Sequence, residues 1–213
     1  TVRMAFTVAN VATLATYLTG TTDTTEATKV INWVRGTDVA GYRPRAVKVD
    51  LNGAGDTLDT GETAARVWKL GDILNSTPKI SSWMPLNTYH KTYGDPTYGV
   101  PFQDSALGNA VDNNRFTTKQ AYKDRGMVYV GGNDGMLHAF KLGKLELKWG
   151  GQQPTEVAKL SGTDLGKEEW AFIPKNALPY LKYMTDTGYC HIYSIDLTPY
   201  IFDASIGGDP EVT

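Results

Sequence analysis

The chain has 213 residues, 41% of them hydrophobic, and its 21 Lys and Arg against 23 Asp and Glu give a formal net charge of -2. This is the composition of a globular protein that is long enough for one or two cores. It provides neither a basic surface for nucleic acid nor an apolar run that could span a bilayer, so both classes are excluded. The single cysteine, Cys190, rules out an internal disulfide and multi-cysteine metal sites, and we expect it to be buried in a strand.

The N-terminal region is predicted to contain a strand followed by two helices. Apolar residues alternate from Val2 to Val8, as in a strand, and then take helical spacing from Val11 to Leu18. Asp23 and Glu26 form the pattern of a capping box, in which each side chain bonds to a backbone N–H near the other residue. The helix that follows should end at Gly36. Its inner face is expected to consist of Ala27, Val30, Ile31 and Val34.

Residues 37–63 are rich in Gly, Asp, Asn and Thr, which is typical of a loop. Calcium needs roughly six to eight oxygen ligands, and acidic residues separated by glycines can supply them from a short segment. Carboxylates that converge would also repel one another unless a divalent cation neutralised them. The loop departs from the EF-hand register at Ala54 and Gly61, so a solvated loop closed by Asx turns is an open alternative. The candidate calcium ligands are Asp50, Asn52, Asp56, Asp59 and Glu62.

A second irregular segment covers residues 87–125, where Pro96 and Pro101 oppose regular helix and central strand. Long loops of this kind are often functional, and tyrosine among Asn, Gly and Asp is typical of recognition surfaces. The alternative is that the aromatic rings only hold the loop against the body of the protein. The candidate partner-binding residues are Tyr89, Tyr93, Tyr98 and Phe102.

A β-hairpin is predicted over residues 128–140. Val128 and Val130 alternate with Tyr129 on the first strand, and a similar alternation continues on the second strand up to Phe140. Between the strands, the sequence Asn-Asp-Gly at 133–135 tolerates the positive φ angles that a tight turn requires.

The C-terminal third is predicted to contain a short helix at 176–184, broken by Pro179. Alternating residues at 191–195 predict a further strand, and Tyr200 with Phe202 would begin its return.

Five segments resemble, in the same order, the PilC/PilY family of type IV pilus biogenesis factors and tip adhesins. They are Ile31–Gly36, Leu70–Ile73 with Ser76–Pro78, the hairpin Tyr129–Phe140, Gly166–Pro174, and His191–Asp196. Several ordered matches are more specific than one Asp-Gly hairpin.

The resemblance implies a mainly β fold that is part of a quinoprotein-like β-propeller, with one blade and the start of another. Residues 1–36 would form a helical segment that leads into it, and residues 37–213 a partial propeller with insertions at 37–63, 87–125 and 143–165. Trp170 would then pack in the core between two blades. A propeller needs at least about four blades of about forty residues. The remaining blades are therefore expected in a longer parent chain, of which this chain would be an excised piece, or in a partner chain.

The function that the resemblance implies is pilus assembly and tip adhesion by a non-enzymatic scaffold. Its partners would be minor pilins or the pilus fibre, and its location the pilus tip, outside the cell or at the outer-membrane surface. The sequence has no hydrolase or phosphate-binding motif, and His90, His138 and His191 lie in separate segments. His138 is expected to have its hydrogen bonds satisfied within the blade. The alternatives are a quinoprotein dehydrogenase-like propeller and a scaffold for extracellular filaments or outer-membrane assembly.

Overall fold

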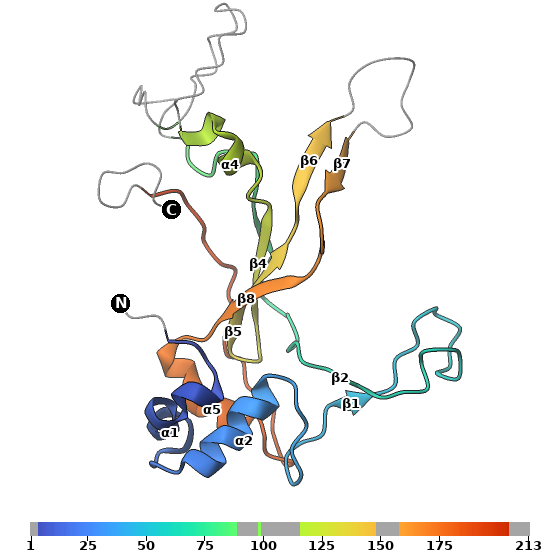
Figure 1. Ribbon diagram of the computed structural model, residues 1–213, viewed down its shortest axis with the longest axis vertical. Coiled ribbons are helices and arrows are strands. Elements are labelled where there is room, and N and C mark those ends of the chain that lie inside the picture. The colour runs from blue at the N-terminus through green and yellow to red at the C-terminus, as the bar shows by residue number, and fades with distance from the viewer. Residues whose placement is uncertain (1–3, 89–97, 99–115, 148–157, 205–213) are drawn as a thin grey trace, which may run out of the picture. The chain divides into compact units, whose positions relative to one another are not determined.

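The computed structural model describes residues 4–88, 98, 116–147 and 158–204 (Figure 1). The chain divides into two compact units. The first unit comprises Thr1–Leu74, Gly132–Leu137 and Phe172–Asp196, and the second comprises Asn75–Gly131, His138–Ala171 and Leu197–Thr213. No helix in the described ranges has the length and apolar character needed to cross a membrane.

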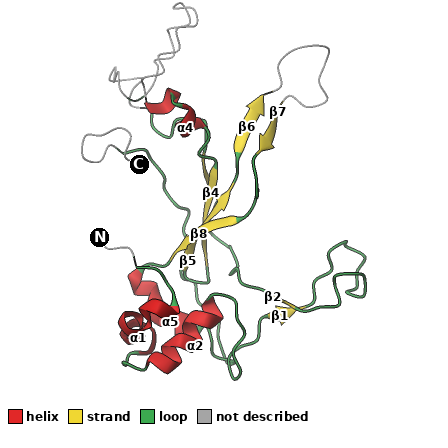
Figure 2. Ribbon diagram, viewed as in Figure 1, coloured by secondary structure: helices red, strands yellow, loops and turns green. Residues whose placement is uncertain are grey.

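The core of the first unit is made by three helices, α1 (Val11–Thr19), α2 (Thr24–Val34) and α5 (Leu178–Tyr183), which are red in Figure 2. The predicted spacing is confirmed for α1 and α2, because their apolar faces are the faces that are buried. Short 3-10 turns, Val8–Asn10 and Lys175–Ala177, precede α1 and α5. The buried cluster consists of Leu14, Ala15, Leu18, Ala27, Val30, Ile31, Trp33, Leu178, Leu181 and Met184, with Val34 partly buried against it.

At the N-terminal end of α2, only the Asp23 half of the predicted capping box forms. The Asp23 carboxylate accepts the backbone N–H groups of Thr25 at 2.9 Å and Glu26 at 3.1 Å. Glu26 does not reach back, because its carboxylate accepts a hydrogen bond from Lys182 Nζ, and the N–H of Asp23 donates to Thr21 Oγ1 instead. The capping box is therefore half formed.

Two predictions are wrong, one for the segment before α1 and one for α5. Residues 4–7 form no strand, since Val8–Asn10 is already a 3-10 turn and no described strand pairs with this segment. Pro179 does not break a helix at 176–184. It lies in the first turn of α5, where a missing N–H costs nothing, and so helps to start the helix.

Two short strands of the first unit, β1 (Ala46–Val47) and β2 (Arg66–Val67), pair antiparallel with Ala46 opposite Val67. They bring together the two ends of the acidic loop between them.

The main sheet contains four strands in the order β3-β4-β5-β8. Their bounds are Lys79–Ser81, Met127–Gly132, Met136–Lys141 and Glu168–Phe172. β3 runs antiparallel to β4, with Lys79 opposite Tyr129. A separate antiparallel pair, β6 (Lys144–Leu147) and β7 (Ala158–Ser161), lies within the predicted insertion at 143–165. None of these sheets closes on itself in the described part of the chain.

The predicted hairpin is confirmed as β4 and β5. Gly135 has a φ of 86° at the turn, and its N–H donates to the carbonyl of Gly132 at 3.2 Å. Burial does not alternate as expected, because Val130 and the next three residues are all buried near the turn. His138 on β5 is buried, and its Nδ1 lies 2.5 Å from Glu168 Oε1 on β8, so its predicted hydrogen bonding is confirmed.

Two predictions for the remaining sheet residues are wrong, and a third is not tested. Residues 191–195 and 200–202 form no strand, because no other strand pairs with them among the described residues. Cys190 is exposed in this irregular segment. Trp170 contacts Tyr129, with ring centroids 5.9 Å apart, and 44% of it is exposed. Its packing against a second blade stays a prediction.

Within residues 116–125, where regular helix was not expected, a 3-10 turn at Phe116–Thr118 leads into the short helix α4 (Gln120–Lys123). The two prolines that motivated the expectation lie outside the described residues.

Candidate functional site

The acidic loop lies between β1 and β2 in the first unit. Its first half is organised by Asp50, whose two carboxylate oxygens accept four consecutive backbone N–H groups. These bonds, led by the one from Gly55, hold the pKa of Asp50 below its ordinary value. The carboxylate is therefore used by the backbone, as in an Asx-type turn. The donors lie 2.6 to 3.2 Å away and belong to Asn52, Gly53, Ala54 and Gly55.

The second half of the loop brings three acidic side chains together. One carboxylate oxygen from each of Asp56, Asp59 and Glu62 lies within 4.8 Å of the other two. Asn52 joins this group through its Nδ2, which donates to Asp59 Oδ2 at 2.8 Å. The structure thus gathers three of the five predicted calcium ligands, attaches the fourth by a hydrogen bond, and directs Asp50 elsewhere.

Glu62 differs from the other two acids because only 2% of it is exposed. Its Oε1 accepts the N–H of Leu51 at 2.7 Å, whereas its Oε2 is buried and has no hydrogen-bond partner in the described chain. A buried carboxylate oxygen without a partner is costly, and a cation would satisfy it. Three carboxylates could hold calcium if backbone carbonyls and water completed the shell.

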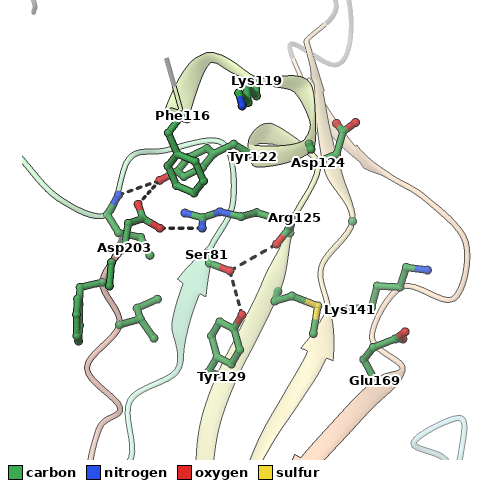
Figure 3. Close-up of a pocket in the computed structure, with 18 of the residues that line it drawn as sticks. Ser81, Phe116, Lys119, Tyr122, Asp124, Arg125, Tyr129, Lys141, Glu169 and Asp203 are labelled. Carbon is green, nitrogen blue, oxygen red and sulfur yellow. Dashed lines mark hydrogen bonds and ion pairs between the residues drawn. The ribbon is translucent and has the colours of Figure 1, made fainter. Parts of the chain in front are cut away.

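The second unit contains an open cavity of about 1030 Å³, shown in Figure 3. Its walls come from β3, β4, α4 and the segment 200–204. Ser81 and Tyr129 lie at one side, and their hydroxyl oxygens are 3.3 Å apart. Charged side chains of both signs, including Lys141 and Glu169, line the opening. The lining of the cavity therefore carries both positive and negative charges.

Asp203 is the centre of a buried polar network in this cavity. Its Oδ2 accepts hydrogen bonds from the hydroxyls of Tyr98 at 2.5 Å and Tyr122 at 2.7 Å. Its Oδ1 accepts one from Arg125 Nη1 at 2.8 Å, and the Arg125 guanidinium lies 3.6 Å from the centroid of the Tyr122 ring. Asn87 Nδ2 donates to the Asp203 carbonyl at 2.7 Å. The network fixes the segment that follows residue 200 to the wall of the cavity.

The network also shifts the pKa values of its members. Burial raises the pKa of Asp203, but the hydrogen bonds from Arg125, Tyr98 and Tyr122 outweigh it, so the net pKa is lowered. Burial, and then the bond to Asp203, raise the pKa of Tyr122 to about 12 and that of Tyr98 further. Asp203 is therefore ionised and both tyrosines are neutral donors at neutral pH.

Of the four predicted partner-binding aromatic residues, only Tyr98 lies among the described residues. Tyr98 is 4% exposed, and its hydroxyl also accepts the N–H of Asn87 at 2.9 Å, so in this structure its ring stabilises the cavity wall. Tyr89, Tyr93 and Phe102 lie outside the described residues. A recognition role for this group stays a prediction.

Sequence reasoning did not identify Asp203, Tyr122 or Arg125. The residues that contact Asp203 lie 78 to 116 positions away from it in the sequence, so no local pattern connects them. The only signal was weak: an acidic residue directly after the alternating apolar side chains at 200–202.

Comparison with known proteins finds relatives by sequence only. No family model matches the chain, and no solved structure matches it. A Type IV pilus biogenesis factor PilY1 homolog from Xylella fastidiosa is 27% identical over 186 residues, which cover 79% of this chain. A second such homolog from the same organism is 31% identical over 69% of the chain. Type IV pilus biogenesis factor PilY1 from Pseudomonas aeruginosa PAO1 is 32% identical over 65% of the chain.

These matches cover only 9 to 10% of the relatives' own length, so the chain corresponds to about a tenth of each relative. They agree with the resemblance derived from the five sequence segments. The chain is a partial, PilY1-like homologue of the type IV pilus biogenesis factors.

Proposed function

We propose that this chain forms part of a non-enzymatic, pilus-associated scaffold that promotes type IV pilus assembly and tip adhesion. The observation that supports the proposal is the match of 65 to 79% of the chain to proteins named as pilus biogenesis factors. Rigid sheets that carry long loops are suited to presenting those loops to a partner. The partners would be minor pilins or the pilus fibre, at the pilus tip or the outer-membrane surface.

The architecture that goes with this function is a partial β-propeller. The hairpin β4–β5 with β3 and β8 gives a four-stranded antiparallel unit of the size of one blade. Under this proposal, the remaining blades belong to a longer parent chain or to a partner chain.

The test uses the parent protein in its native host. A tagged parent protein should recover minor pilins from a pull-down, and deletion of the parent gene should reduce the number of surface pili seen by electron microscopy. Restoring the gene should restore the pili. Normal piliation after deletion, together with no recovery of minor pilins, would contradict the proposal.

We also propose that the acidic loop binds calcium through Asp56, Asp59 and Glu62. The support is the convergence of the three carboxylates within 4.8 Å and the buried, unpartnered Oε2 of Glu62. An affinity near the millimolar range is typical of extracellular calcium modules. Magnesium is disfavoured because it demands near-ideal octahedral geometry, which a loop rich in glycine does not impose.

Isothermal titration of calcium into the full chain tests this proposal. Asp56→Asn and Glu62→Gln should each weaken binding by about tenfold or more, since each removes one charged ligand. Asp38→Asn is the matched control, because Asp38 is exposed in the same unit and precedes β1, outside the acidic segment between β1 and β2. Identical isotherms for all four proteins would support the solvated loop instead.

A further inference from the structure

A second cavity, of about 350 Å³, lies entirely within the first unit. Its wall is formed by the end of α2, residues 43–47 and 68–72, the hairpin turn, the end of α5 and residues 189–191. This volume is at the lower end of the range for small-molecule sites.

Two arginines in this wall are held in place by aromatic rings. The Arg45 guanidinium lies 3.6 Å from the centroid of the Trp33 ring, and the Arg43 guanidinium lies 5.5 Å from Trp33 and 4.5 Å from Tyr189. Arg45 also donates to the carbonyl of Trp33, and Arg43 Nε donates to the carbonyl of Met184 at 3.0 Å. Because their positions are fixed, neither cation would lose much conformational freedom on binding an anion.

Arg45 also carries an unsatisfied donor. Its Nε is buried and has no hydrogen-bond partner within the described residues. Burial lowers the pKa of Arg45 from its ordinary value. Because the Arg45 Nε atom has almost no accessible surface, a ligand in the cavity does not reach it, so Arg45 acts as part of the wall and the other two cations, Arg43 and Lys69, are the ones open to a ligand.

Arg45 is already balanced by Asp38 and Asp134, whose negative charges oppose the lowering of its pKa by burial. Arg43, Arg45 and Lys69 face two carboxylates, and both carboxylates are already used by the protein. Asp72 Oδ2 accepts from Asn133 Nδ2 at 3.1 Å and lies 3.4 Å from His191 Nε2.

The second carboxylate, Asp134, accepts the backbone N–H groups of Gly71 at 2.8 Å and Met136 at 3.2 Å. Lys69 makes no ion pair with any described residue. Arg43 likewise makes no ion pair in the described part of the chain, so these two cations suit a ligand with one negative charge.

The cavity also has an exposed apolar surface. Trp68 lines it with 60% of its surface exposed, beside Trp33 and Tyr189. A flat indole packs against the apolar C–H face of a sugar ring, while fixed arginines bind a carboxylate through paired N–H donors. We propose that this cavity binds a hexuronate, with its carboxylate toward Arg43 and Lys69 and its ring against Trp68.

This ligand class accounts for both features of the wall. A neutral sugar would leave Arg43 and Lys69 without an anionic partner, and a simple carboxylate such as acetate would leave the indole uncovered. The carboxylate and the ring could come from a free sugar acid or from the terminal residue of an acidic polysaccharide.

Calorimetric titration of the full chain with sodium D-galacturonate tests the proposal. Galacturonate should bind, whereas D-galactose and acetate should each bind at least about tenfold more weakly, because each lacks one of the two recognised groups. A trimer of galacturonate identifies the source: tighter binding of the trimer assigns a polysaccharide end, and equal affinity assigns the single sugar.

Two variants connect binding to this cavity. Lys69→Gln and Trp68→Ala should each weaken galacturonate binding by about tenfold. Both residues are exposed, so the fold should persist, and far-ultraviolet circular dichroism checks this. The matched controls are Lys48→Gln, an exposed lysine outside the cavity, and Trp170→Ala, a partly exposed tryptophan of the second unit.

The proposal is overturned if galacturonate does not bind, or if galactose or acetate binds equally well. It is also overturned if Lys69→Gln and Trp68→Ala bind like their controls. These results are independent of the pilus proposal, which is tested by piliation and pilin recovery.

Discussion

Replacing Asp203 should destabilise the second unit more than any ordinary surface substitution. Its buried carboxylate accepts two tyrosine hydroxyls and one guanidinium donor, at 2.5, 2.7 and 2.8 Å. Removing it takes the carboxylate acceptor from the buried hydroxyls of Tyr98 and Tyr122, at about 1 to 3 kcal/mol each, and leaves Tyr122 only a long hydrogen bond of 3.4 Å to the Met84 carbonyl. The Arg125 side chain is 25% exposed, so water should satisfy part of its lost interaction. Asp203→Ala should therefore cost about 3 to 5 kcal/mol, as for a broken buried pair.

Urea denaturation of the full chain measures this loss as a lower midpoint at unchanged slope. Tyr98→Phe and Tyr122→Phe are the controls, since each removes one hydroxyl and keeps its ring. Each should cost about 1 kcal/mol. A loss below about 1 kcal/mol for Asp203→Ala would refute the reasoning, because it would mean that solvent replaces the network.

The same network predicts a dependence on pH. The folded state lowers the pKa of Asp203, so its stabilisation is present above the unfolded carboxyl pKa of about 3.9. It is lost as the pH falls through the lower pKa of the folded state. Asp203→Asn should therefore flatten the stability profile below about pH 4. A profile as steep as that of the wild type would show that other carboxylates cause the acid unfolding.

Two further predictions concern helix α2. Asp23→Ala removes the acceptor of two backbone N–H groups and should lower the free energy of unfolding by about 1 kcal/mol, whereas Asp23→Asn should lose less. Equal losses for both variants would contradict the capping role. Hydrogen bonds from Lys182 and Tyr42 lower the pKa of Glu26 to about 2, so its stabilisation is present above the ordinary pKa of 4.5 and is lost as the pH falls through about 2. Glu26→Gln should remove this acid dependence, and an unchanged profile in thermal denaturation between these pH values would argue against the ion pair.

The sequence determined the features that depend on neighbouring residues. The 3.6-residue period between Ala27 and Val34 was sufficient for α2, and Asn-Asp-Gly at 133–135 was sufficient for the hairpin, because helix periodicity and turn conformation are local properties. The acidic loop was also visible as a candidate cation site from its composition. The five ordered segments indicated the family before any comparison.

Strand pairing and burial were decided by the tertiary structure. Residues 191–195 alternate like a strand, but a strand needs a partner, and none pairs with them in the described chain. Within the acidic loop, composition could not tell Asp50, which binds backbone N–H groups, from Glu62, which is buried with an unpartnered oxygen.

The two cavities were also beyond local prediction. Asp203 meets Tyr98 across 105 positions, and Arg43 meets Met184 across 141, so neither contact leaves a periodic trace in the sequence. Sequence patterns record which residues are apolar and how they are spaced. Which charged side chains share one cavity depends on how distant segments pack, and only the folded chain determines that.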